Sequence, residues 1–553
     1  METAPREEQW KAEKDGLDVI HDIPTFAKKG YKSIPDSDFF RLRWYGLFHD
    51  KPKDGHFMHR IRISGGCVTS EQLRVLGNIS KGFGQSYAEI TTRQQLQLHS
   101  IEIEHAPEIL SKLVAVGLNS TGAGADNVRG ICGCPVAGID VDEVCDATPV
   151  LNEVVKLYVG NKEYSNLPRK FNVSVTGCAS QCSAPEISDI GVVAVKNASG
   201  EIGYTFLIGG GLGSTPHLAK HLPLFVSPSD VVKVMAVVTS IWKDSNEYRM
   251  RRSRARFKFM IDDWGMEKFQ AEVEKRMTCN YSYVNGLPRP NGPPTDHMGV
   301  IRQKQEGFYW VGVPVTVGRI TAEQLLALAD ITERFGSRQL RFTHMQNFII
   351  PSVPAENLAR LFIELEKVGF KNGASALRTK TVACTGLPYC TYSILETKTA
   401  TQKIIDHLEN VFGDRLPDVR IGTSGCPFAC GQHWISDIGL IGCGILTKVG
   451  NVKGFDIAVG GSTGEFSGVA RVVKKRVPVE EVKFAIEKFL SAYLSMRKAD
   501  ESFTKFCAAR SEEELGNMFG EYNIEIATSI SPLSQLIAPT LMATQTHTRE
   551  AGI

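Results

Sequence analysis

The sequence predicts an α+β protein that is built from two related halves. Residues 59–101 and 309–353 each show an alternating strand, a Thr-capped helix beginning T-S-E-Q-L or T-A-E-Q-L, and a second alternating strand, and a further helix follows each copy. A second pair of segments, 175–194 and 423–442, shares the tetrad I-S-D-I-G. We therefore expect a pseudo-two-fold body of two βαβ-type units and two larger mixed α/β units, with the functional site at their junction.

The repeats divide the 553-residue chain, which is long enough for about three or four domains, into six segments. A stretch rich in Gly, Pro and Asn over 280–299 is typical of a linker and marks the boundary between the halves. In chain order we expect an N-terminal arm over 1–50, a first-repeat half-domain over 51–122, a first α/β unit over 123–285, the linker and a second-repeat half-domain over 286–372, a second α/β unit over 373–505 and a C-terminal extension over 506–553. We expect the end of this extension to be disordered.

Composition and charge exclude several classes of protein. Hydrophobic residues make up 42% and charged residues 22% of the chain, which excludes disordered, collagen-like and coiled-coil proteins. A formal net charge of +2 gives no general reason to bind nucleic acid or a membrane surface. Thirteen cysteines spread along the chain indicate a reducing compartment, and the acidic N-terminus resembles neither a signal peptide nor a transit peptide. We expect a cytoplasmic protein without nucleic-acid or membrane partners.

The strongest chemical signal is a set of four cysteines in the second half. Cys384 and Cys390 form one pair, C-x5-C, and Cys426 and Cys430 form another, C-x3-C. Two local pairs of thiolates suit a soft metal centre, because each pair can bind from one turn while the fold brings the turns together. Zinc is the rival occupant, although structural zinc sites prefer tighter spacing. Four unligated buried cysteines are the remaining alternative.

At these cysteines the chain resembles the assimilatory nitrite and sulfite reductases, and it is most similar to the ferredoxin-nitrite reductases. The resemblance covers nearly the whole chain except its terminal extensions, and it includes TTRQQLQLH from Thr91, NVRGICGCPVAGID from Asn127 and LPRKFNVSVTG from Leu167. It implies the duplicated nitrite/sulfite reductase fold, with ferredoxin-like half-domains and a sirohaem-binding unit over 123–285. It also implies that Cys384, Cys390, Cys426 and Cys430 hold a [4Fe-4S] cluster, and that Cys430 bridges the cluster to the sirohaem iron.

The resemblance also implies which side chains hold the sirohaem, whose eight carboxylates require cations and amide donors. Arg93 and Gln97 are expected on one strand with their side chains on the same face, and Gln346 and Asn347 at the equivalent place in the second copy. The alternative for each of these residues is an exposed polar strand face. A basic run from Tyr248 is expected to supply a few arginines to the sirohaem, and to leave the others to solvent or ferredoxin.

For the substrate, the resemblance points to four polar side chains on the open face of the iron. Arg60, Arg129 and Lys170 supply positive charge where an oxyanion binds and where protons are delivered. At the position of Asn172, the similar segment of sulfite reductases has a second lysine, L-P-R-K-x-K. The segment LPRKFN of this chain instead resembles that of the nitrite reductases. Nitrite is a planar monoanion and needs less charge than sulfite, so Asn172 favours nitrite. Phe48 stands where some sulfite-reducing relatives have tyrosine.

The implied reaction is the six-electron reduction of nitrite to ammonia in nitrate assimilation, by a monomeric oxidoreductase. No G-x-G-x-x-G fingerprint or flavin module is evident in the sequence, so we expect the electrons to come from ferredoxin or a similar small protein. The Gly-rich run 209–213 lacks the Lys and Ser/Thr of a phosphate loop and predicts a tight turn instead. The alternatives are a sulfite reductase with the same cofactors, a sirohaem-free iron-sulfur electron carrier, and a structural zinc protein.

The first half contains cysteines whose role the resemblance does not explain. Cys178 and Cys182 align with the C-x3-C pair of the second half, whereas Cys132 and Cys134 do not reproduce C-x5-C. A second cluster at these residues is one interpretation, and buried thiols without a redox role are the favoured one. Iron counting separates the two, because a second cluster adds about four irons per chain.

Overall fold

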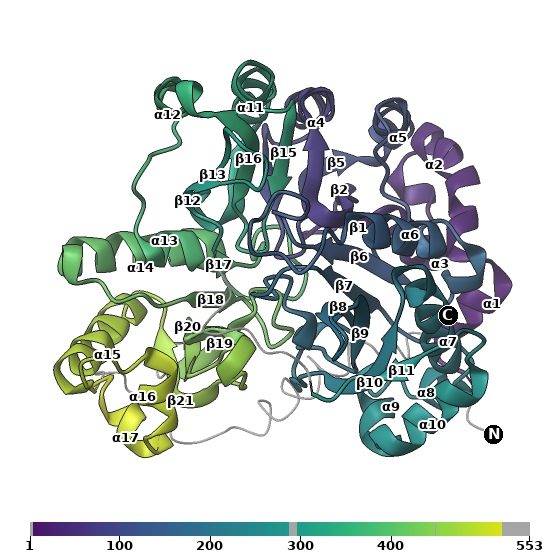
Figure 1. The fold of residues 1–553 in the computed structure, drawn as a ribbon. Helices are drawn as coiled ribbons and strands as arrows, with labels where there is room; N and C mark the ends of the chain where they lie inside the picture. The colour runs from purple at the N-terminus through teal and green to yellow at the C-terminus, as the bar shows by residue number, and fades with distance from the viewer. Residues whose placement is uncertain (1–3, 287–295, 448–449, 522–553) are drawn as a thin grey trace.

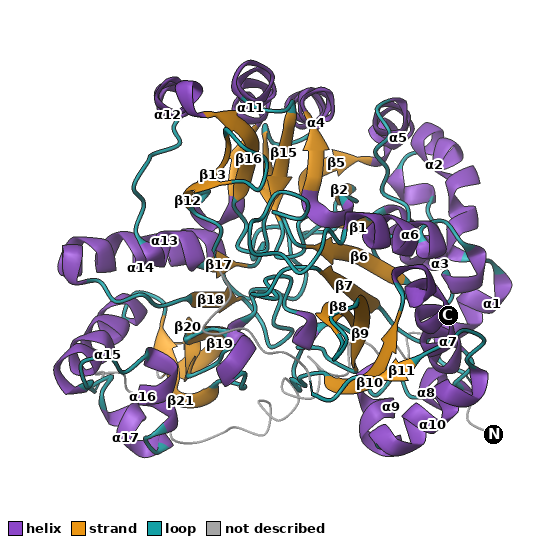
Figure 2. Cartoon of the chain, viewed as in Figure 1, coloured by secondary structure: helices purple, strands orange, loops and turns teal. Residues whose placement is uncertain are grey.

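The computed structural model describes residues 4–286, 296–447 and 450–521, and its elements repeat in the order that the duplication predicts (Figure 1). Two five-stranded sheets lie side by side in one layer, and each half adds a further mixed sheet with its own helices. Figure 2 shows that the helices lie on the outside and that loops from the four sheets gather at the centre.

The N-terminal arm is helical and packs on the first half. It consists of α1 (Arg6–Glu13), α2 (Ile23–Lys29) and α3 (Asp36–Arg41), which share a core with the buried Trp44. The indole N–H of Trp44 donates to the carbonyl of Ser165 at 2.8 Å, which fastens the arm to the first α/β unit. The arm then runs into β1 (Leu47–His49), the edge strand of the first ferredoxin-like sheet.

The two ferredoxin-like half-domains contain corresponding elements. The first has β2 (His56–Ile61), β3 (Cys67–Thr69), α4 (Ser70–Phe83), β4 (Tyr87–Ile90), β5 (Leu96–Glu102) and α5 (Ala106–Ala115). The second has β12 (Gly299–Arg302), β13 (Phe308–Val313), β14 (Arg319–Thr321), α11 (Ala322–Phe335), β15 (Gln339–Phe342), β16 (Phe348–Pro354) and α12 (Leu358–Lys367). Thr69 and Thr321 form the predicted caps of α4 and α11, each in a capping box with a glutamine three residues later.

The two ferredoxin-like sheets exchange one strand with each other. The first sheet has the order β1-β2-β5-β4-β14, and β14 comes from the second half. The second sheet has the order β12-β13-β16-β15-β3, and β3 comes from the first half. Helices α4 and α11 pack against each other, and the apolar residues of both sheets form one shared core. The exchange makes the two half-domains one structural unit.

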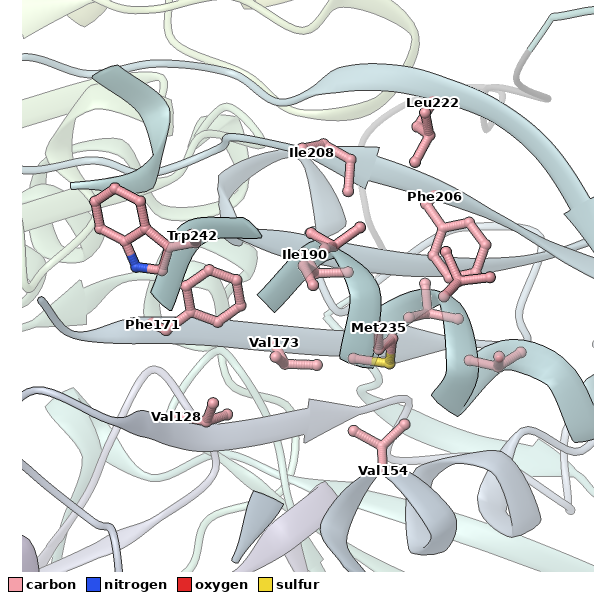
Figure 3. Packing of buried hydrophobic residues seen from close by; sticks show 14 of the residues in the cluster. Val128, Val154, Phe171, Val173, Ile190, Phe206, Ile208, Leu222, Met235 and Trp242 are labelled. Carbon is pink, nitrogen blue, oxygen red and sulfur yellow. The ribbon is translucent and has the colours of Figure 1, made fainter. Parts of the chain in front are cut away.

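The two larger units each surround a mixed sheet. The first contains β6 (Val128–Gly133), α6 (Thr148–Tyr158), β7 (Phe171–Thr176), β8 (Ile190–Lys196), β9 (Ile202–Ile208), β10 (Lys220–Val226), α7 (Val231–Lys243), α8 (Asn246–Met250), α9 (Phe257–Trp264), α10 (Met266–Arg276) and β11 (Ser282–Tyr283). Strands β6, β7 and β8 are parallel, and β9, β10 and β11 continue the sheet antiparallel. Figure 3 shows its core, where Phe171 and Phe206 of the sheet lie near Trp242 and Met235 of α7.

The second unit repeats this arrangement and includes the start of the C-terminal extension. It contains α13 (Ala376–Lys380), β17 (Val382–Ala383), α14 (Thr397–Phe412), β18 (Ile421–Ser424), β19 (Ile438–Thr447), β20 (Gly450–Val459), β21 (Arg471–Pro478), α15 (Val482–Met496), α16 (Phe503–Ala508) and α17 (Glu512–Asn517). Phe506, Leu515 and Phe519 of the extension are buried in the core of this unit. The expected disordered end and residues 287–295 of the expected linker lie outside the described residues.

The strand register fixes which residues of the two halves correspond. Gly133 of β6 is opposite Val175 of β7, and Ala383 of β17 is opposite Thr423 of β18. Val175 and Thr423 hold the same place in the repeated segments V-T-G-C and T-S-G-C. Gly133 therefore corresponds to Ala383, and the residue after each of them opens an equivalent loop.

Candidate active site

The four second-half cysteines lie in two loops that follow neighbouring parallel strands. Cys384 comes directly after β17, and its N–H donates to the carbonyl of Thr423 at 3.0 Å. Cys390 closes a turn by donating its N–H to the carbonyl of Gly386 at 2.9 Å. Cys426 and Cys430 lie in the loop after β18. Because carboxyl ends of parallel strands share one edge, the fold brings both pairs together, as their spacing predicts.

The cysteines of these loops shift one another's pKa values. Burial and the charge of Cys430 raise the pKa of Cys384 to about 12, and the same two causes raise the pKa values of Cys390 and Cys426. Gathering thiolates without a cation is unfavourable, whereas a metal cluster neutralises them and stabilises the deprotonated form. The donor set therefore fits a [4Fe-4S] cluster. Cys430 is the exposed residue of the set, whereas Cys384, Cys390 and Cys426 are half-buried.

The cysteine loops lie against the first ferredoxin-like sheet. The hydroxyl of Thr92 donates to the carbonyl of Cys430 at 3.3 Å. The side-chain N–H of Gln97 donates to the hydroxyl of Thr385, next to Cys384, at 2.9 Å. Residues of the first half thus contact both cysteine loops of the second half, which places the site at the predicted junction.

The four expected substrate residues come from three strands of the first half. Arg60 lies on β2, Arg129 on β6 and Asn172 on β7, and Lys170 lies directly before β7. All four side chains are half-buried. The guanidinium of Arg60 donates to Gln97 Oε1 at 2.8 and 3.1 Å, and it lies over the ring of Phe48 with 5.1 Å to the ring centroid. These contacts hold Arg60 in place without neutralising it.

The electrostatic couplings show that these residues share one region with the cluster loop. Burial and the charge of Arg60 lower the pKa of Arg129 to about 9, and burial lowers that of Arg60 to about 10. Burial, Arg256 and Arg129 lower the pKa of Lys170 well below its ordinary value. Cys430 acts in the opposite direction on both Arg60 and Lys170.

The substrate-pocket cations have no ion-paired carboxylate within the part of the chain that the structure describes. Among the described residues, Arg60, Arg129 and Lys170 form no ion pair with a carboxylate, and the Nε atom of Arg93 is buried without a hydrogen-bond partner. Buried like charges are costly unless an anion compensates them. The pocket therefore fits a polycarboxylate such as sirohaem together with a small anionic substrate.

The expectation that Arg93 and Gln97 share a strand is wrong, because Arg93 lies in the turn between β4 and β5. The hydroxyl of Thr91 accepts the backbone N–H groups of Arg93 and Gln95 at 3.2 and 3.0 Å, and Gln94 has a φ of 60°. A threonine hydroxyl that binds the backbone in this way ends the strand early. Arg93 donates to the carbonyls of Gly130 and Val173, and Gln97 alone lies on β5.

Gln346 and Asn347 also lie in a turn, between β15 and β16, and they correspond to Gln94 and Gln95 rather than to Arg93 and Gln97. Gln346 donates to the carbonyls of Ile90 and Ala383 at 2.7 and 3.1 Å and accepts the N–H of Ala383 at 2.9 Å. Asn347 accepts the N–H of Val315 and donates to the carbonyl of Thr379. Their roles toward sirohaem stay predictions, which these contacts do not support.

Most arginines of the basic run have partners inside the chain. Arg252 donates to Asp126 at 2.6 Å, and Arg256 contacts Asp189 at 3.2 Å. Arg249 and Arg254 pair with Glu8 and Asp263, respectively. These arginines thus bind the N-terminal arm and stabilise their own unit. Fewer arginines remain to bind a cofactor or a protein partner than the composition of the run indicates.

A buried charged network beneath the first cysteine loop was not predicted from the sequence. Glu89 accepts the hydroxyl of Thr385 at 2.8 Å and lies 3.4 Å from His99 and 4.0 Å from Lys398. Burial opposes charge on His99, but Asp50 and Glu89 raise its pKa. These residues are far apart in sequence and form no motif, so only the alternation of β4 and β5 could have placed Glu89 and His99 together.

The two halves have diverged at the site. The N–H groups of Asn172 and Arg420 donate to the aspartates of the two I-S-D-I-G tetrads at 2.8 Å, so these two residues correspond. Lys170 then corresponds to Asp418, two residues earlier. The second half therefore lacks this part of the anion pocket, whereas it supplies the paired cysteines beside Arg60 and Lys170.

A duplicated α+β body with clustered thiols next to uncompensated cations defines an iron-sulfur oxidoreductase that acts on a small anion. The chain belongs to the nitrite and sulfite reductase family: the nitrite and sulphite reductase 4Fe-4S domain matches residues 124–281 and 374–512, and the ferredoxin-like half-domain of these enzymes matches 49–116 and 301–368. The fold class and the family resemblance are confirmed. As a member, the protein takes a [4Fe-4S] cluster and a sirohaem as its cofactors.

Named relatives include enzymes for both anions. An assimilatory ferredoxin-dependent nitrite reductase of Haloferax mediterranei is 35% identical, and the match covers 92% of each chain. A ferredoxin sulfite reductase of Mycolicibacterium paratuberculosis is 36% identical over 89% of this chain and 92% of its own. The structure of the Mycobacterium tuberculosis NirA protein superposes with a TM-score of 0.87 at 33% identity, covering 92% of this chain and 97% of that one. Within the described ranges, each helix is too short or too polar to cross a bilayer.

Proposed function

We propose that the protein reduces nitrite to ammonia with electrons from reduced ferredoxin. Nitrite takes up six electrons and eight protons and leaves as one ammonium ion and two waters. The observation that carries this proposal is Asn172, a neutral amide on β7 two residues after Lys170, at a position where a second lysine would suit sulfite. Overall identity does not separate the two anions, because nitrite and sulfite reductases match about equally well.

The proposed roles of the pocket residues follow from their charges. Arg60 and Arg129 bind and orient the anion, since both are half-buried cations that form no ion pair with a carboxylate among the described residues. Lys170 exchanges protons with the substrate oxygens, because its lowered pKa makes its proton available closer to neutral pH. Asn172 offers a hydrogen bond without charge. Sirohaem, when bound, supplies an iron that coordinates the anion and receives electrons one at a time.

The proposed cofactor ligands are the four paired cysteines and the neighbouring basic side chains. Cys384, Cys390, Cys426 and Cys430 would hold the cluster, and the exposed Cys430 would be the ligand shared with the sirohaem iron. Arg93, whose Nε is buried without a partner, is the best-supported contact for sirohaem carboxylates. Gln97 acts by holding Arg60 and Thr385 at the junction between pocket and cluster loop.

The test is oxidation of a reduced viologen dye by the anaerobically purified holoenzyme, offered nitrite and sulfite in parallel. We expect rapid formation of ammonia and slow release of sulfide, and the reverse ratio would make the protein a sulfite reductase. Replacing the dye by reduced ferredoxin then tests the donor, because a ferredoxin-dependent enzyme turns over with it and not with NADPH. Loss of the Soret band with retained cluster absorption would identify the electron-carrier alternative.

The proposal includes a monomer in the cytoplasm. All thirteen cysteines are free thiols in the described structure, which suits a reducing compartment. The two halves already supply both sides of the site, so a second copy is not needed to complete it. Sedimentation of the holoenzyme tests this, and we expect a single species with the mass of one chain.

A further inference from the structure

A second group of potential metal ligands lies in the first half, away from the four cluster cysteines. Cys134, Cys182 and His297 are buried, and their ligand atoms all lie within 4.8 Å of one another. The sulfur of Cys178 lies 3.5 Å from that of Cys182 and is also hydrogen-bonded with Cys134. Cys178 therefore lies beside the two thiols of this group, and Trp310 and other apolar side chains pack around the cysteines.

The symmetry of the fold shows where this group comes from. Because Gly133 corresponds to Ala383, Cys134 corresponds to Cys384. Cys178 and Cys182 correspond to Cys426 and Cys430 by the shared C-x3-C spacing. Three of the four cluster positions are therefore occupied by cysteine in both halves.

The fourth position differs. Cys390 follows Cys384 by six residues, and the residue six after Cys134 is Asp140, which does not belong to the gathered group. His297 supplies the fourth donor instead, from the segment that precedes β12 of the second half. The first-half group thus has a histidine from the start of the second half where the second-half group has its fourth cysteine.

The spacing of the donors suits one ion rather than a cluster. In a tetrahedral zinc site with Zn–S bonds of about 2.3 Å, neighbouring sulfurs are about 3.8 Å apart, close to the 3.5 Å between Cys178 and Cys182. In a cubane each thiolate binds a different iron, so the sulfurs must lie farther apart. No three of the second-half cysteines gather within 4.8 Å of one another among the described residues, in keeping with that larger centre.

The surroundings of Cys178 stabilise a thiolate. Its sulfur accepts hydrogen bonds from the backbone N–H of Cys182 and the hydroxyl of Ser180, both at 3.5 Å, and lies 3.2 Å from the hydroxyl of Thr176. Such contacts around a sulfur are the outer partners that orient metal-bound cysteines. These hydrogen bonds to the Cys178 sulfur are therefore in keeping with a metal ligand.

We propose that Cys134, Cys178, Cys182 and His297 bind a single zinc ion with tetrahedral Cys3His coordination, separate from the catalytic cofactors. All four positions carry protein ligands, so the ion is structural and has no open site for substrate. It connects the end of β6, the loop after β7 and the segment before β12, and so joins the first α/β unit to the second ferredoxin-like half-domain.

The test is metal analysis of the holoenzyme after zinc addition and desalting. We expect about one zinc and about five irons per chain, four in the cluster and one in the sirohaem. Zinc-edge absorption spectroscopy of the wild-type protein should give three sulfurs near about 2.3 Å and one nitrogen near about 2.0 Å. About nine irons without zinc would show a second cluster, and no metal beyond five irons would show plain thiols; either result overturns the proposal.

Variants make the assignment specific. Cys178→Ala should lose most of the zinc and keep the five irons, whereas Cys132→Ser, a buried thiol of β6 outside the group, should keep both. His297→Cys should retain zinc with four sulfur ligands, and this readout remains if Cys178→Ala fails to fold. Zinc content that is unchanged in Cys178→Ala, or equally lost in Cys132→Ser, contradicts the assigned ligands. None of these measurements depends on which anion the enzyme reduces.

Discussion

Gln94 and Gln346 make the same contact in opposite directions across the pseudo-two-fold junction. The side-chain N–H of Gln94 donates to the carbonyl of Phe342 in β15 at 2.9 Å, and that of Gln346 donates to the carbonyl of Ile90 in β4 at 2.7 Å. Both glutamines have a φ of 60°, which directs each side chain out of its own turn. The two side chains thus tie each ferredoxin-like half-domain to a strand of the other.

Gln346→Ala should therefore destabilise the protein. The substitution leaves the carbonyl of Ile90 and the N–H of Ala383 without their partners in a buried place, which costs roughly 2 to 4 kcal/mol. Urea unfolding of the wild type and variant measures the difference. Gln402→Ala, on an exposed position of α14, is the control and should stay within about 0.5 kcal/mol of the wild type. Equal stabilities of the two variants would contradict a structural role of the Gln346 amide.

Asn172→Lys should shift the preference toward sulfite. The new ammonium adds positive charge beside Lys170 and Arg129, which favours a dianion over a monoanion. We expect the ratio of sulfide to ammonia formed to rise about tenfold, the equivalent of 1.4 kcal/mol. Asn172→Gln keeps the amide and serves as the matched variant. A ratio that is the same in the Lys and Gln variants would remove Asn172 as the specificity residue.

Lys170→Arg should separate charge from proton transfer. Arginine keeps the positive charge but holds its proton far more tightly than a lysine whose pKa is lowered by burial, Arg256 and Arg129. We expect kcat for nitrite to fall about 100-fold with little change in KM. The alkaline limb of the pH–rate profile should also be lost. An unchanged kcat would mean that Lys170 only binds the anion.

His99→Gln should destabilise the protein in a pH-dependent way. Burial works against the charged ring, but Asp50 and Glu89 raise the pKa of His99 above its usual 6.5. The stabilisation by the charged ring is thus complete below pH 6.5 and is lost as the pH rises through the folded-state pKa. Thermal unfolding from pH 6 to pH 9 should show the largest gap between wild type and variant at the acid end. A gap that widens toward pH 9 contradicts a charged His99.

Cys390→Ser should remove the cluster, because a hydroxyl is a poor ligand for iron compared with a thiolate. We expect the iron content to fall by about four per chain and electron transfer from reduced viologen to nitrite to stop. Cys443→Ser, at a half-buried position of β19 outside the group, should keep both iron and activity. Retention of the cluster in Cys390→Ser would require a different fourth ligand.

Repeated motifs and residue spacing in the sequence predicted the duplicated helices and the two cysteine loops. The repeated T-[SA]-E-Q-L segments became the capped helices α4 and α11, and the pairs C-x5-C and C-x3-C became loops at one edge of β17 and β18. The four substrate residues were placed on the first half, where the structure has Arg60, Arg129 and Asn172 on three strands.

What the sequence missed depends on contacts between distant segments. The placement of Arg93 on a strand failed because the Thr91 hydroxyl binds the backbone and turns the chain, which alternation cannot reveal. The amides of Gln346 and Asn347 looked like cofactor contacts, yet they bind backbone groups of remote strands. His297 carries no motif with the first-half cysteines, and only the fold brings it beside them.

The exchange of β3 and β14 also sets the order in which the protein can be completed on the ribosome. Strand β4 is synthesised about 230 residues before the β14 that covers its edge, a delay of roughly 10 to 50 s at the usual rate of translation. During that time the nascent first half exposes an unpaired sheet edge, which other chains can join. Slow elongation or high expression should therefore cause aggregation of the emerging chain, even though β14 pairs with β4 in the finished protein.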